Sequence, residues 1–440
     1  MNLSKYIGGL GKALALSCVL FTASSCEIDA VLDPNNPSLA GVTENATRSE
    51  IQNLVDGIQG GMRIRLGTYY DGVGVIGREY YRFSASDPRF TSDLLGKGEA
   101  ILDNNTFYTT GPFAARYRTI RNCLILIAAA ENTTNLTAEE VEATVGFAQT
   151  IMGHEYLLVL NQMGANGIRF DVDTDGSPFL SESESLSAIG GLLDEGATAL
   201  TNAGADFPFS LTSGFASTSD PVTFRQFNRA LAARVALYAG DDAGALSALD
   251  DSFYDIAGDL NTGVYLPYSS AGGDELNPMW FPLDATGETR VAHPSFVDDA
   301  DAADARLSKA TARTESAFQD DLTSDYDVTV YATNTDPISV LRNEELILIN
   351  AEANARSGNS GPAVTAIDAI RAAHGLGAYA GGTDEASLID EILVQRRYSL
   401  YGEGHRWVDM RRYGRLGELP IDRAGDDVWE AFPIPATENQ

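Results

Sequence analysis

Residues 391–414 have the sequence EILVQRRYSLYGEGHRWVDMRRYG, and the chain ends shortly after Phe432-Pro433-Ile434-Pro435. The first of these stretches combines a helical pattern, a glycine turn and a segment in which His405 and Trp407 lie among arginines and acidic residues. Buried arginine and carboxylate side chains satisfy each other, so no substrate is needed to explain them. We therefore predict a network of ion pairs and cation–π contacts that ties the last helix to the rest of the fold.

Upstream, two segments share one pattern. Residues 230–253 and 349–372 each combine a small-residue helix, a glycine turn and a second helix with alanines spaced for close packing. Helix hairpins of this kind, which resemble tetratricopeptide units, bury one face only against their neighbours. The pattern predicts a mainly α-helical protein in which the two segments belong to one scaffold.

Amphipathic periodicity predicts where the helices lie, beginning near Thr47. The expected helices cover 111–132, 137–163, 186–203, 221–240, 242–253, 338–357, 360–373 and 385–402. Between 256 and 335 the periodicity is lost among Gly, Asp, Pro and scattered aromatics, which favours a loop-rich insertion. We expect one unit over 46–440, made of an N-terminal helical part (46–255), the insertion (256–335) and a C-terminal helical part (336–440).

The C-terminal motifs carry a resemblance to a known family. The Arg396-Arg397 helix end, Glu403-Gly-His-Arg-Trp407, the Asp-x-Arg-Arg stretch at 409–412 and the terminal Phe-Pro-Ile-Pro together resemble the SusD/RagB family. So do the acidic, Ala-rich helix around Ala351-Glu352-Ala353-Asn354 and the helix that follows it. The resemblance implies a SusD-like helical scaffold that is not an enzyme. It also implies a lipoprotein that binds glycans at the cell surface and covers a SusC-like TonB-dependent transporter in the outer membrane.

The N-terminus is typical of a bacterial export signal. Lys5 and Lys12 flank a short apolar run that small residues and Cys26 follow. We expect a lipoprotein signal peptide over 1–25, a lipid on Cys26 and an extended tether over 26–45. The lipid would be the only membrane attachment, and the location would be the outer membrane, on the cell surface. Ordinary secretion with a free Cys26 is the alternative.

The sequence contains no strong catalytic motif. Its four histidines lack zinc-protease spacing, and no Gly-x-Ser-x-Gly elbow or Cys/His metal cluster occurs. The Gly72-x-Gly74-x-x-Gly77 pattern is interpreted as a flexible loop, because a helix precedes it where a dinucleotide fingerprint needs a strand. A glycoside hydrolase stays open as an alternative, since its two acids need no sequence signature. A second alternative is a protein that covers the same type of transporter but binds peptides or other oligomers.

Sugars stack their C–H faces on aromatic rings while planar polar groups hold their hydroxyls, so aromatic-rich loops are the places to seek a ligand. Two regions qualify, one after the first helix and one in the insertion, and Trp280 is the best single candidate. Loop packing is the alternative for each aromatic. The candidate ligand-binding residues are Tyr69, Tyr70, Asp71, Arg78, Tyr80, Tyr81, Tyr265, Tyr268, Asn277 and Trp280.

A further motif follows the spacing of a calcium-binding loop, with carboxylates at positions one, three and five, glycine at six and glutamate at twelve. Its candidate ligands are Asp171, Asp173, Asp175, Ser177 and Glu182. The alternative is a solvated acidic connector, which is common in so acidic a chain. No cofactor is required by any other pattern.

The charge of the chain limits its partners. The 440 residues include 62 Asp and Glu against 30 Lys and Arg, for a formal net charge of -32. Such a surface repels phosphate backbones, so nucleic acid is not an expected partner. For the same reason a neutral or cationic glycan is favoured over an acidic one, unless arginines gather at the site.

Overall fold

The structure is a computed structural model that describes residues 39–438 apart from residue 175. Backbone contacts group residues 43–440 into one compact unit. The predicted signal peptide, Cys26 and residues 26–38 of the predicted tether lie outside the described residues. The rest of the tether, expected to be extended, is the helix α2 (Leu39–Asn45). Within the part of the chain that is described, no helix combines the length and apolar character needed to cross a bilayer.

The described chain is mainly α-helical, as predicted. The α-helices are α2 (Leu39–Asn45), α3 (Arg48–Arg63), α4 (Leu66–Ile76), α5 (Phe107–Glu131), α6 (Ala138–Met163), α7 (Glu182–Asn202), α8 (Pro221–Ala239), α9 (Asp242–Asp250), α10 (Pro294–Asp298), α11 (Asn343–Arg356), α12 (Ser360–Ala373), α13 (Glu385–Ser399) and α14 (Arg406–Arg412). The helices expected from periodicity are present, with ends that differ by a few residues. One expectation is wrong in part: residues 338–342, expected as the start of a helix, form a strand that pairs with residues 263–266, and the helix begins at Asn343.

Side-chain caps explain several of these helix starts. At α3 the Thr47 hydroxyl accepts a hydrogen bond from the Glu50 backbone N–H, and the Glu50 carboxylate accepts one from the Thr47 N–H. The same reciprocal pair occurs at α7 between Ser181 and Glu184. Each capping box satisfies two backbone donors that the first turn of a helix leaves unpaired.

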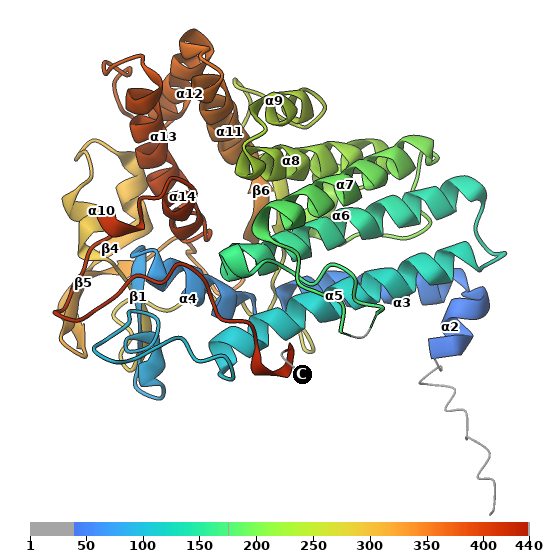
Figure 1. The fold of residues 1–440 in the computed structure, drawn as a ribbon, viewed down its shortest axis with the longest axis horizontal. Helices are drawn as coiled ribbons and strands as arrows, with labels where there is room; N and C mark the ends of the chain where they lie inside the picture. The colour runs from blue at the N-terminus through green and yellow to red at the C-terminus, as the bar shows by residue number, and fades with distance from the viewer. Residues whose placement is uncertain (1–38, 175, 439–440) are drawn as a thin grey trace, which may run out of the picture. The chain divides into compact units, whose positions relative to one another are not determined.

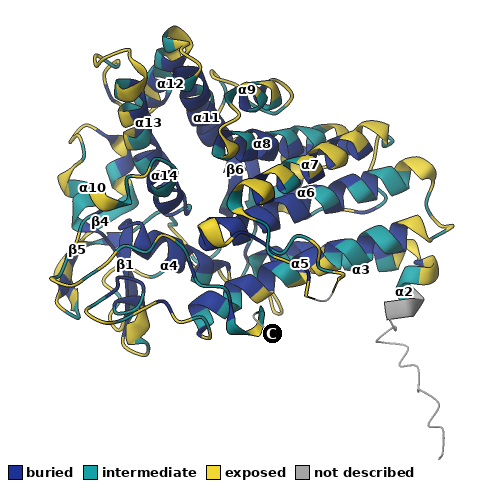
Figure 2. Cartoon of the chain, viewed as in Figure 1, coloured by how far each residue is buried: buried dark blue, intermediate teal, exposed yellow. Residues whose placement is uncertain are grey.

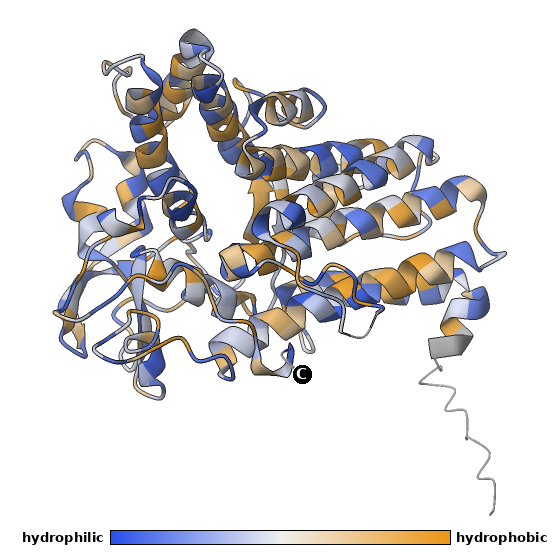
Figure 3. Ribbon diagram, viewed as in Figure 1, coloured by the Kyte–Doolittle hydropathy of each residue, from blue (hydrophilic) through white to orange (hydrophobic). Residues whose placement is uncertain are grey.

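Successive helices pack side by side in a continuous array (Figure 1). Contacts run from α3 to α5, α6, α7, α8 and α9, and α8 and α9 then contact α11, which packs against α12 and α13. The buried residues lie between these helices (Figure 2), and the apolar residues follow the packed faces (Figure 3). The N- and C-terminal helical parts therefore form one scaffold, as predicted.

Both predicted hairpins are confirmed. One is α8 followed by α9, and the other is α11 followed by α12. Gly240 and Gly358 occupy the two turns with φ of +79° and +77°. This left-handed conformation is strained for residues with a Cβ, so glycine is what lets each helix reverse direction at once.

The insertion differs from the irregular segment that the sequence suggested. Its strands are β2 (Gly263–Leu266), β3 (Glu288–Ala292), β4 (Ala310–Gln319) and β5 (Leu322–Val328). These strands lie in two small sheets, one with the strand order β1-β3-β5-β4 and one with the order β2-β6. The other two strands of these sheets are β1 (Tyr80–Ser84) and β6 (Ile338–Arg342). Because β1 and β6 lie outside 256–335, antiparallel pairing attaches the insertion to the scaffold at both ends.

The C-terminal motif forms the predicted ion-pair network. Arg396 donates to Asp409 at 2.7 Å, and Arg412 donates to both Asp409 at 2.8 Å and Glu352 of α11 at 2.7 Å. Burial alone would raise the pKa of Asp409, but Arg396 and Arg412 lower it to about 2. These pairs join α13 and α14 to the helix array.

Aromatic contacts complete the closure. Trp407 is fully buried, the Arg411 guanidinium lies 4.6 Å from its ring centroid, and its indole N–H donates to the Trp429 carbonyl. The Phe432 ring contacts Trp407, and the Phe432 N–H donates to the carbonyl of Gln162 in α6. The Phe-Pro-Ile-Pro tail is therefore a fixed part of the fold.

We predict that Asp409→Ala destabilises the protein by about 3–5 kcal/mol, because it leaves two buried arginines without their shared carboxylate. Chemical denaturation measures this loss. Asp251→Ala is the matched control, since Asp251 pairs with Arg225 at 2.9 Å but is largely exposed, and it should cost less than about 1 kcal/mol. Equal, small losses for both variants would contradict a structural role for the network.

Candidate functional site

The first predicted ligand region, residues 69–81, is not an exposed loop. Residues 66–76 form α4 and residues 80–84 form β1. The prediction of a loop is wrong because the glycines serve close packing instead. A Cβ on Gly74 would lie 2.7 Å from the Tyr80 ring, and one on Gly72 would lie 3.0 Å from Phe432.

All six candidate residues of this region are buried, which corrects the exposure that the sequence suggested. They are Tyr69, Tyr70, Asp71, Arg78, Tyr80 and Tyr81. The Tyr80 hydroxyl donates to the Tyr70 carbonyl at 2.8 Å, and burial raises the pKa of Tyr69 to about 12. Ligand contact by these residues stays a prediction, and their geometry does not support it.

Two of these residues hold the fold together. The Asp71 carboxylate accepts two hydrogen bonds from Arg290 of β3, at 2.6 and 2.8 Å. The Arg78 guanidinium donates to the carbonyls of Pro420 and Asp427, at 3.0 and 2.8 Å. Asp71 therefore fixes the insertion against α4, and Arg78 fixes the C-terminal tail.

The second predicted region lies at a surface groove with a volume of about 510 Å³. The groove is formed by the 3-10 helix Ser213–Thr218, by β2 and the residues on either side of it, and by the segment before β6. Its lining residues are Ser213, Gly214, Ala216, Ser217, Asn261, Thr262, Gly263, Tyr265, Pro267, Tyr268, Thr335 and Pro337.

Tyr265 and Tyr268 are the aromatic side chains of this groove. Tyr265 is half-buried at an irregularity in the β2–β6 ladder, where such a bulge redirects a side chain. Tyr268 is only 5% exposed, and its buried hydroxyl has no hydrogen-bond partner among the described residues. The Arg63 guanidinium lies 5.6 Å from the centroid of the Tyr268 ring. The groove thus offers one partly exposed aromatic ring, that of Tyr265, while the Tyr268 hydroxyl is buried beneath its surface.

Trp280 is attached to the loop that also borders the groove. Its indole N–H donates to the Ala332 carbonyl at 3.2 Å, and its ring is half-buried. Asn277 is buried and donates from its side chain to the Asp336 carbonyl at 2.8 Å. The structure therefore brings Tyr265, Tyr268, Asn277 and Trp280 around the 332–337 loop, with Asn277 as a support for that loop.

The lining of the groove is uncharged. The residues that form it are polar or apolar but include no Asp, Glu, Lys or Arg. In a chain with 62 acidic residues, such a surface is unusual. Serine, threonine and asparagine can hydrogen-bond hydroxyl groups while the aromatic rings pack against C–H faces, so the groove suits a neutral polyhydroxylated ligand. The sequence did not point to Ser213, Ser217 or Thr335, which lie in loops without a motif.

The first two carboxylates of the predicted calcium loop already have protein partners. The Asp171 carboxylate accepts hydrogen bonds from the backbone N–H groups of Asp173 and Thr174, at 3.0 and 3.1 Å. The Asp173 carboxylate pairs with Arg121. Asp175 lies outside the described residues.

The remaining two candidates lie on either side of a turn into α7. The Ser177 hydroxyl donates to the Asp171 carbonyl, and Glu182 is the first residue of α7. Across the described residues, no group of three or more His, Cys, Asp and Glu is arranged to hold a metal ion. Calcium binding at this loop stays a prediction from its spacing.

One cluster resembles a catalytic triad. His293 Nε2 lies 2.8 Å from Asp422 Oδ1, and His293 Nδ1 lies 2.8 Å from Ser295 Oγ. However, the same Nδ1 accepts the backbone N–H of Ser295, which caps α10, and the Ser295 hydroxyl accepts a hydrogen bond from Arg397. We interpret the cluster as a helix cap.

Comparison with known proteins agrees with the C-terminal motifs. The family model described as the SusD family matches residues 300–436. The match is confined to these C-terminal residues, in the part of the chain that carries the motifs. No curated protein matches it significantly.

Solved structures share the fold of this chain over nearly its whole length. A SusD superfamily protein from Bacteroides vulgatus is 15% identical, covers 89% of this chain and 96% of its own, and gives a TM-score of 0.68. Surface glycan-binding protein A from Bacteroides thetaiotaomicron, in complex with laminarihexaose, is 16% identical, covers 90% of this chain and 97% of its own, and gives a TM-score of 0.69. A laminarin-binding SusD-like protein is 16% identical, covers 90% of this chain and 97% of its own, and gives a TM-score of 0.66.

The SusD-like core of this chain also buries an incompletely satisfied carboxylate. One oxygen of Glu79 accepts the Gly402 N–H at 3.1 Å, and the other has no hydrogen-bond partner among the described residues. Burial raises the pKa of Glu79 to about 7. A raised carboxyl pKa means that the folded state favours the protonated carboxyl. The free energy of unfolding therefore falls as the pH rises from the pKa of Glu79 in the unfolded chain towards its pKa of about 7 in the folded protein.

We predict that Glu79→Gln removes this loss. The variant should match the wild type near pH 4.5 and exceed it at pH 8 by up to about 3 kcal/mol, since each unit of pKa shift corresponds to about 1.4 kcal/mol. Denaturant unfolding at both pH values measures the difference. Glu131→Gln at an exposed position is the control and should leave the pH dependence unchanged. A Glu79→Gln curve parallel to the wild type would contradict the assignment.

Proposed function

We propose that this protein is a surface-exposed lipoprotein that captures oligosaccharides or polysaccharide fragments and delivers them to a TonB-dependent outer-membrane transporter. The observation that carries the proposal is the uncharged groove with Tyr265 and Tyr268, beside Trp280. Stacking and hydroxyl recognition are both available there, and the strongly acidic remainder of the surface is kept out of the lining.

The comparisons favour a neutral glycan. Two structures with the same fold are named for laminarin or were solved with laminarihexaose, which is a neutral oligosaccharide. A neutral ligand also agrees with the absence of charged residues from the groove lining. We therefore take laminarihexaose as the first probe for this chain.

Binding without cleavage is part of the proposal. Glycoside hydrolysis normally needs two carboxyl groups about 5 to 10 Å apart across the scissile bond. The residues that line the groove include no carboxylate. Incubation with laminarin should therefore yield no new reducing ends, and a steady increase in reducing ends would support the hydrolase alternative. Binding of peptides but of no polysaccharide would favour the peptide-binding alternative.

The membrane attachment and the partner are inferred from the sequence and the family. The signal pattern predicts a lipid on Cys26, and the resemblance to the SusD/RagB family implies a SusC-like transporter as the partner. Lipidation would hold the binding unit at the surface through the 26–45 tether. No nucleic acid is expected, because the net charge is -32.

We predict that Trp280→Ala and Tyr265→Ala each weaken laminarihexaose binding about tenfold or more, because each removes an aromatic surface on which a sugar ring stacks. Isothermal titration calorimetry on the full chain measures the change. Phe318→Ala is the control, since Phe318 is 67% exposed on β4 and is not part of the groove lining, and it should leave affinity unchanged.

The placement of the glycan fails if both groove variants bind as tightly as the wild type. Binding that is lost equally in the Phe318→Ala control would point to a general loss of folding instead. Thermal unfolding of each variant separates these two outcomes, because the groove substitutions lie at partly exposed positions and should change the melting temperature little.

We predict that Cys26→Ser abolishes incorporation of labelled fatty acid and releases the protein from the outer-membrane fraction. Detergent extraction followed by a pull-down of the wild type should recover a TonB-dependent barrel protein. Retention of Cys26→Ser in the membrane would contradict lipid anchoring, and the absence of a barrel in the wild-type pull-down would contradict the proposed transporter partnership.

A further inference from the structure

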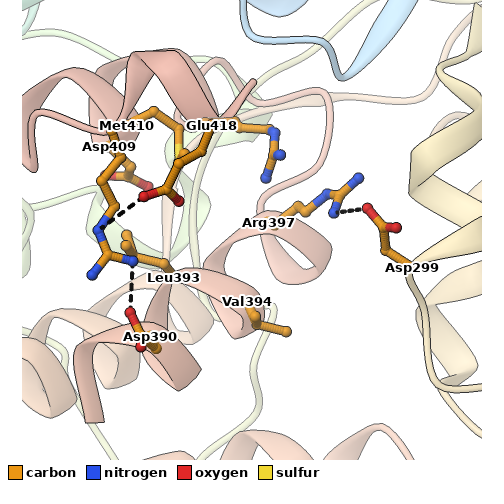
Figure 4. Close-up of a pocket in the computed structure, with 10 residues that line it drawn as sticks. Asp299, Asp390, Leu393, Val394, Arg397, Asp409, Met410 and Glu418 are labelled. Carbon is orange, nitrogen blue, oxygen red and sulfur yellow. Dashed lines mark hydrogen bonds and ion pairs between the residues drawn. The ribbon is translucent and has the colours of Figure 1, made fainter. Parts of the chain in front are cut away.

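A second cavity, of about 590 Å³, lies among α10, α13, α14 and the segment that follows α14 (Figure 4). It shares no lining residue with the uncharged groove. Its lining combines charged and aliphatic side chains. The lining residues are Asp299, Asp390, Leu393, Val394, Arg397, Arg406, Asp409, Met410, Arg415 and Glu418.

Most charges in this cavity are paired with each other. Arg397 donates to Asp299 at 2.9 Å (Figure 4), and Arg415 donates to Asp390 at 2.6 Å. Asp409 belongs to the buried network described above, in which Arg396 and Arg412 hold its carboxylate. These pairs leave little free charge on the lining.

Arg406 is the exception. Its Nε donates to the Gly77 carbonyl at 3.1 Å, and no carboxylate of the described residues lies within 4.0 Å of its guanidinium. Half-buried Arg411 also lacks a carboxylate partner among the described residues, but its terminal nitrogens donate to the Glu430 and Asn161 carbonyls and its guanidinium lies over Trp407. The two terminal nitrogens of Arg406 make no hydrogen bond to the described protein, so both are free to donate.

The surroundings keep this positive charge uncompensated. Burial and then the neighbouring Arg397 lower the pKa of Arg406 to about 10, which leaves it protonated at neutral pH. Glu79 acts on Arg406 from the interior, but burial raises the pKa of that carboxyl to about 7. Three guanidinium groups line the cavity, and Arg406 is the one among them without a carboxylate partner in the described part of the chain.

We propose that this cavity binds an acidic sugar, with the carboxylate of a uronic acid on Arg406. A guanidinium group matches a carboxylate with two parallel N–H···O bonds. The carboxylates of Asp390 and Glu418 can accept hydrogen bonds from sugar hydroxyls, and Leu393, Val394 and Met410 offer aliphatic surface to the C–H face of a ring. The volume falls in the usual range for a small-ligand site.

A sugar acid explains the lining better than an acidic protein segment does. A peptide carboxylate would use the arginine but would leave the acidic side chains of the lining facing another anionic chain. A uronic acid carries hydroxyl donors for those carboxylates beside its own charge. The site lies apart from the neutral groove, and its proposal does not depend on glycan binding there.

The experiment is a titration of the full chain with D-galacturonate and, in parallel, with D-galactose, followed by calorimetry in low salt. The two sugars differ at the carboxylate. We expect galacturonate to bind at least about tenfold more tightly, because a charge-assisted contact in a half-buried site is lost with galactose. Binding should weaken in 0.5 M NaCl, since part of it is electrostatic.

Two variants test the site without relying on one side chain. Arg406→Gln should weaken galacturonate binding about tenfold and leave laminarihexaose binding unchanged. Val394→Glu adds a carboxylate at a 47% exposed position of the cavity and should have the same effect with little change in stability. Val222→Glu, at a 67% exposed position of α8 outside the cavity, is the matched control and should bind galacturonate as the wild type does.

Three results would overturn the proposal. The first is equal affinity for galacturonate and galactose, and the second is undiminished galacturonate binding by Val394→Glu and by folded Arg406→Gln. The third is tight binding of hexaglutamate that both Arg406→Gln and Val394→Glu weaken while galacturonate does not bind, which would assign the cavity to an acidic protein segment. Loss of laminarihexaose binding in Trp280→Ala with galacturonate binding retained would separate the two sites.

Discussion

The pairing of buried arginines with carboxylates from distant parts of the chain is the constraint on which the rest of the structure depends. Arginine supplies 26 of the 30 Lys and Arg residues of this acidic protein. The pairs join particular segments: Arg412 joins α14 to α11, Arg234 joins α8 to the start of α11, and Asp71 joins α4 to β3 through Arg290. A buried charge without its partner costs several kcal/mol, so these pairs favour one arrangement of the helix array, the insertion and the tail.

The same constraint separates two kinds of surface. Where the insertion meets the 213–218 segment, the lining is free of charge and carries Tyr265 and Tyr268. Where α13 and α14 meet, the lining is charged, and Arg406 remains without a carboxylate. Neutral and acidic ligands would be recognised by different physical means at these two places, because stacking needs little charge and a carboxylate needs a cation. The net charge of the chain therefore does not decide alone which ligands it can bind, because the local charge differs between the two places.

The sequence predicted the helices and the C-terminal network well, because periodicity, capping residues and the Arg-rich motif act locally. It failed at 66–84, where Gly72 and Gly74 suggested a loop but allow Phe432 and Tyr80 to pack closely against α4. It also missed the strands of the insertion, since β4 is mostly exposed and lacks an apolar alternation. Tyr265 and Trp280 were predicted as aromatic residues of a loop-rich segment, but only the structure shows the 332–337 loop that brings them together. The sequence did not single out Arg406, because Glu403 and Asp409 lie three residues away on either side, and only the structure shows that they pair with other arginines.

The central claim is that a neutral glycan lies on the 332–337 loop and the tyrosine groove beside it. Hydrogen–deuterium exchange of the full chain, with and without laminarihexaose, tests this most directly because it locates the ligand without any substitution. The account predicts slower exchange in 261–268, 277–281 and 332–337, and unchanged exchange in 69–81. Protection of 69–81 with none at the groove, or no protection by a saturating concentration of the hexasaccharide, would contradict it.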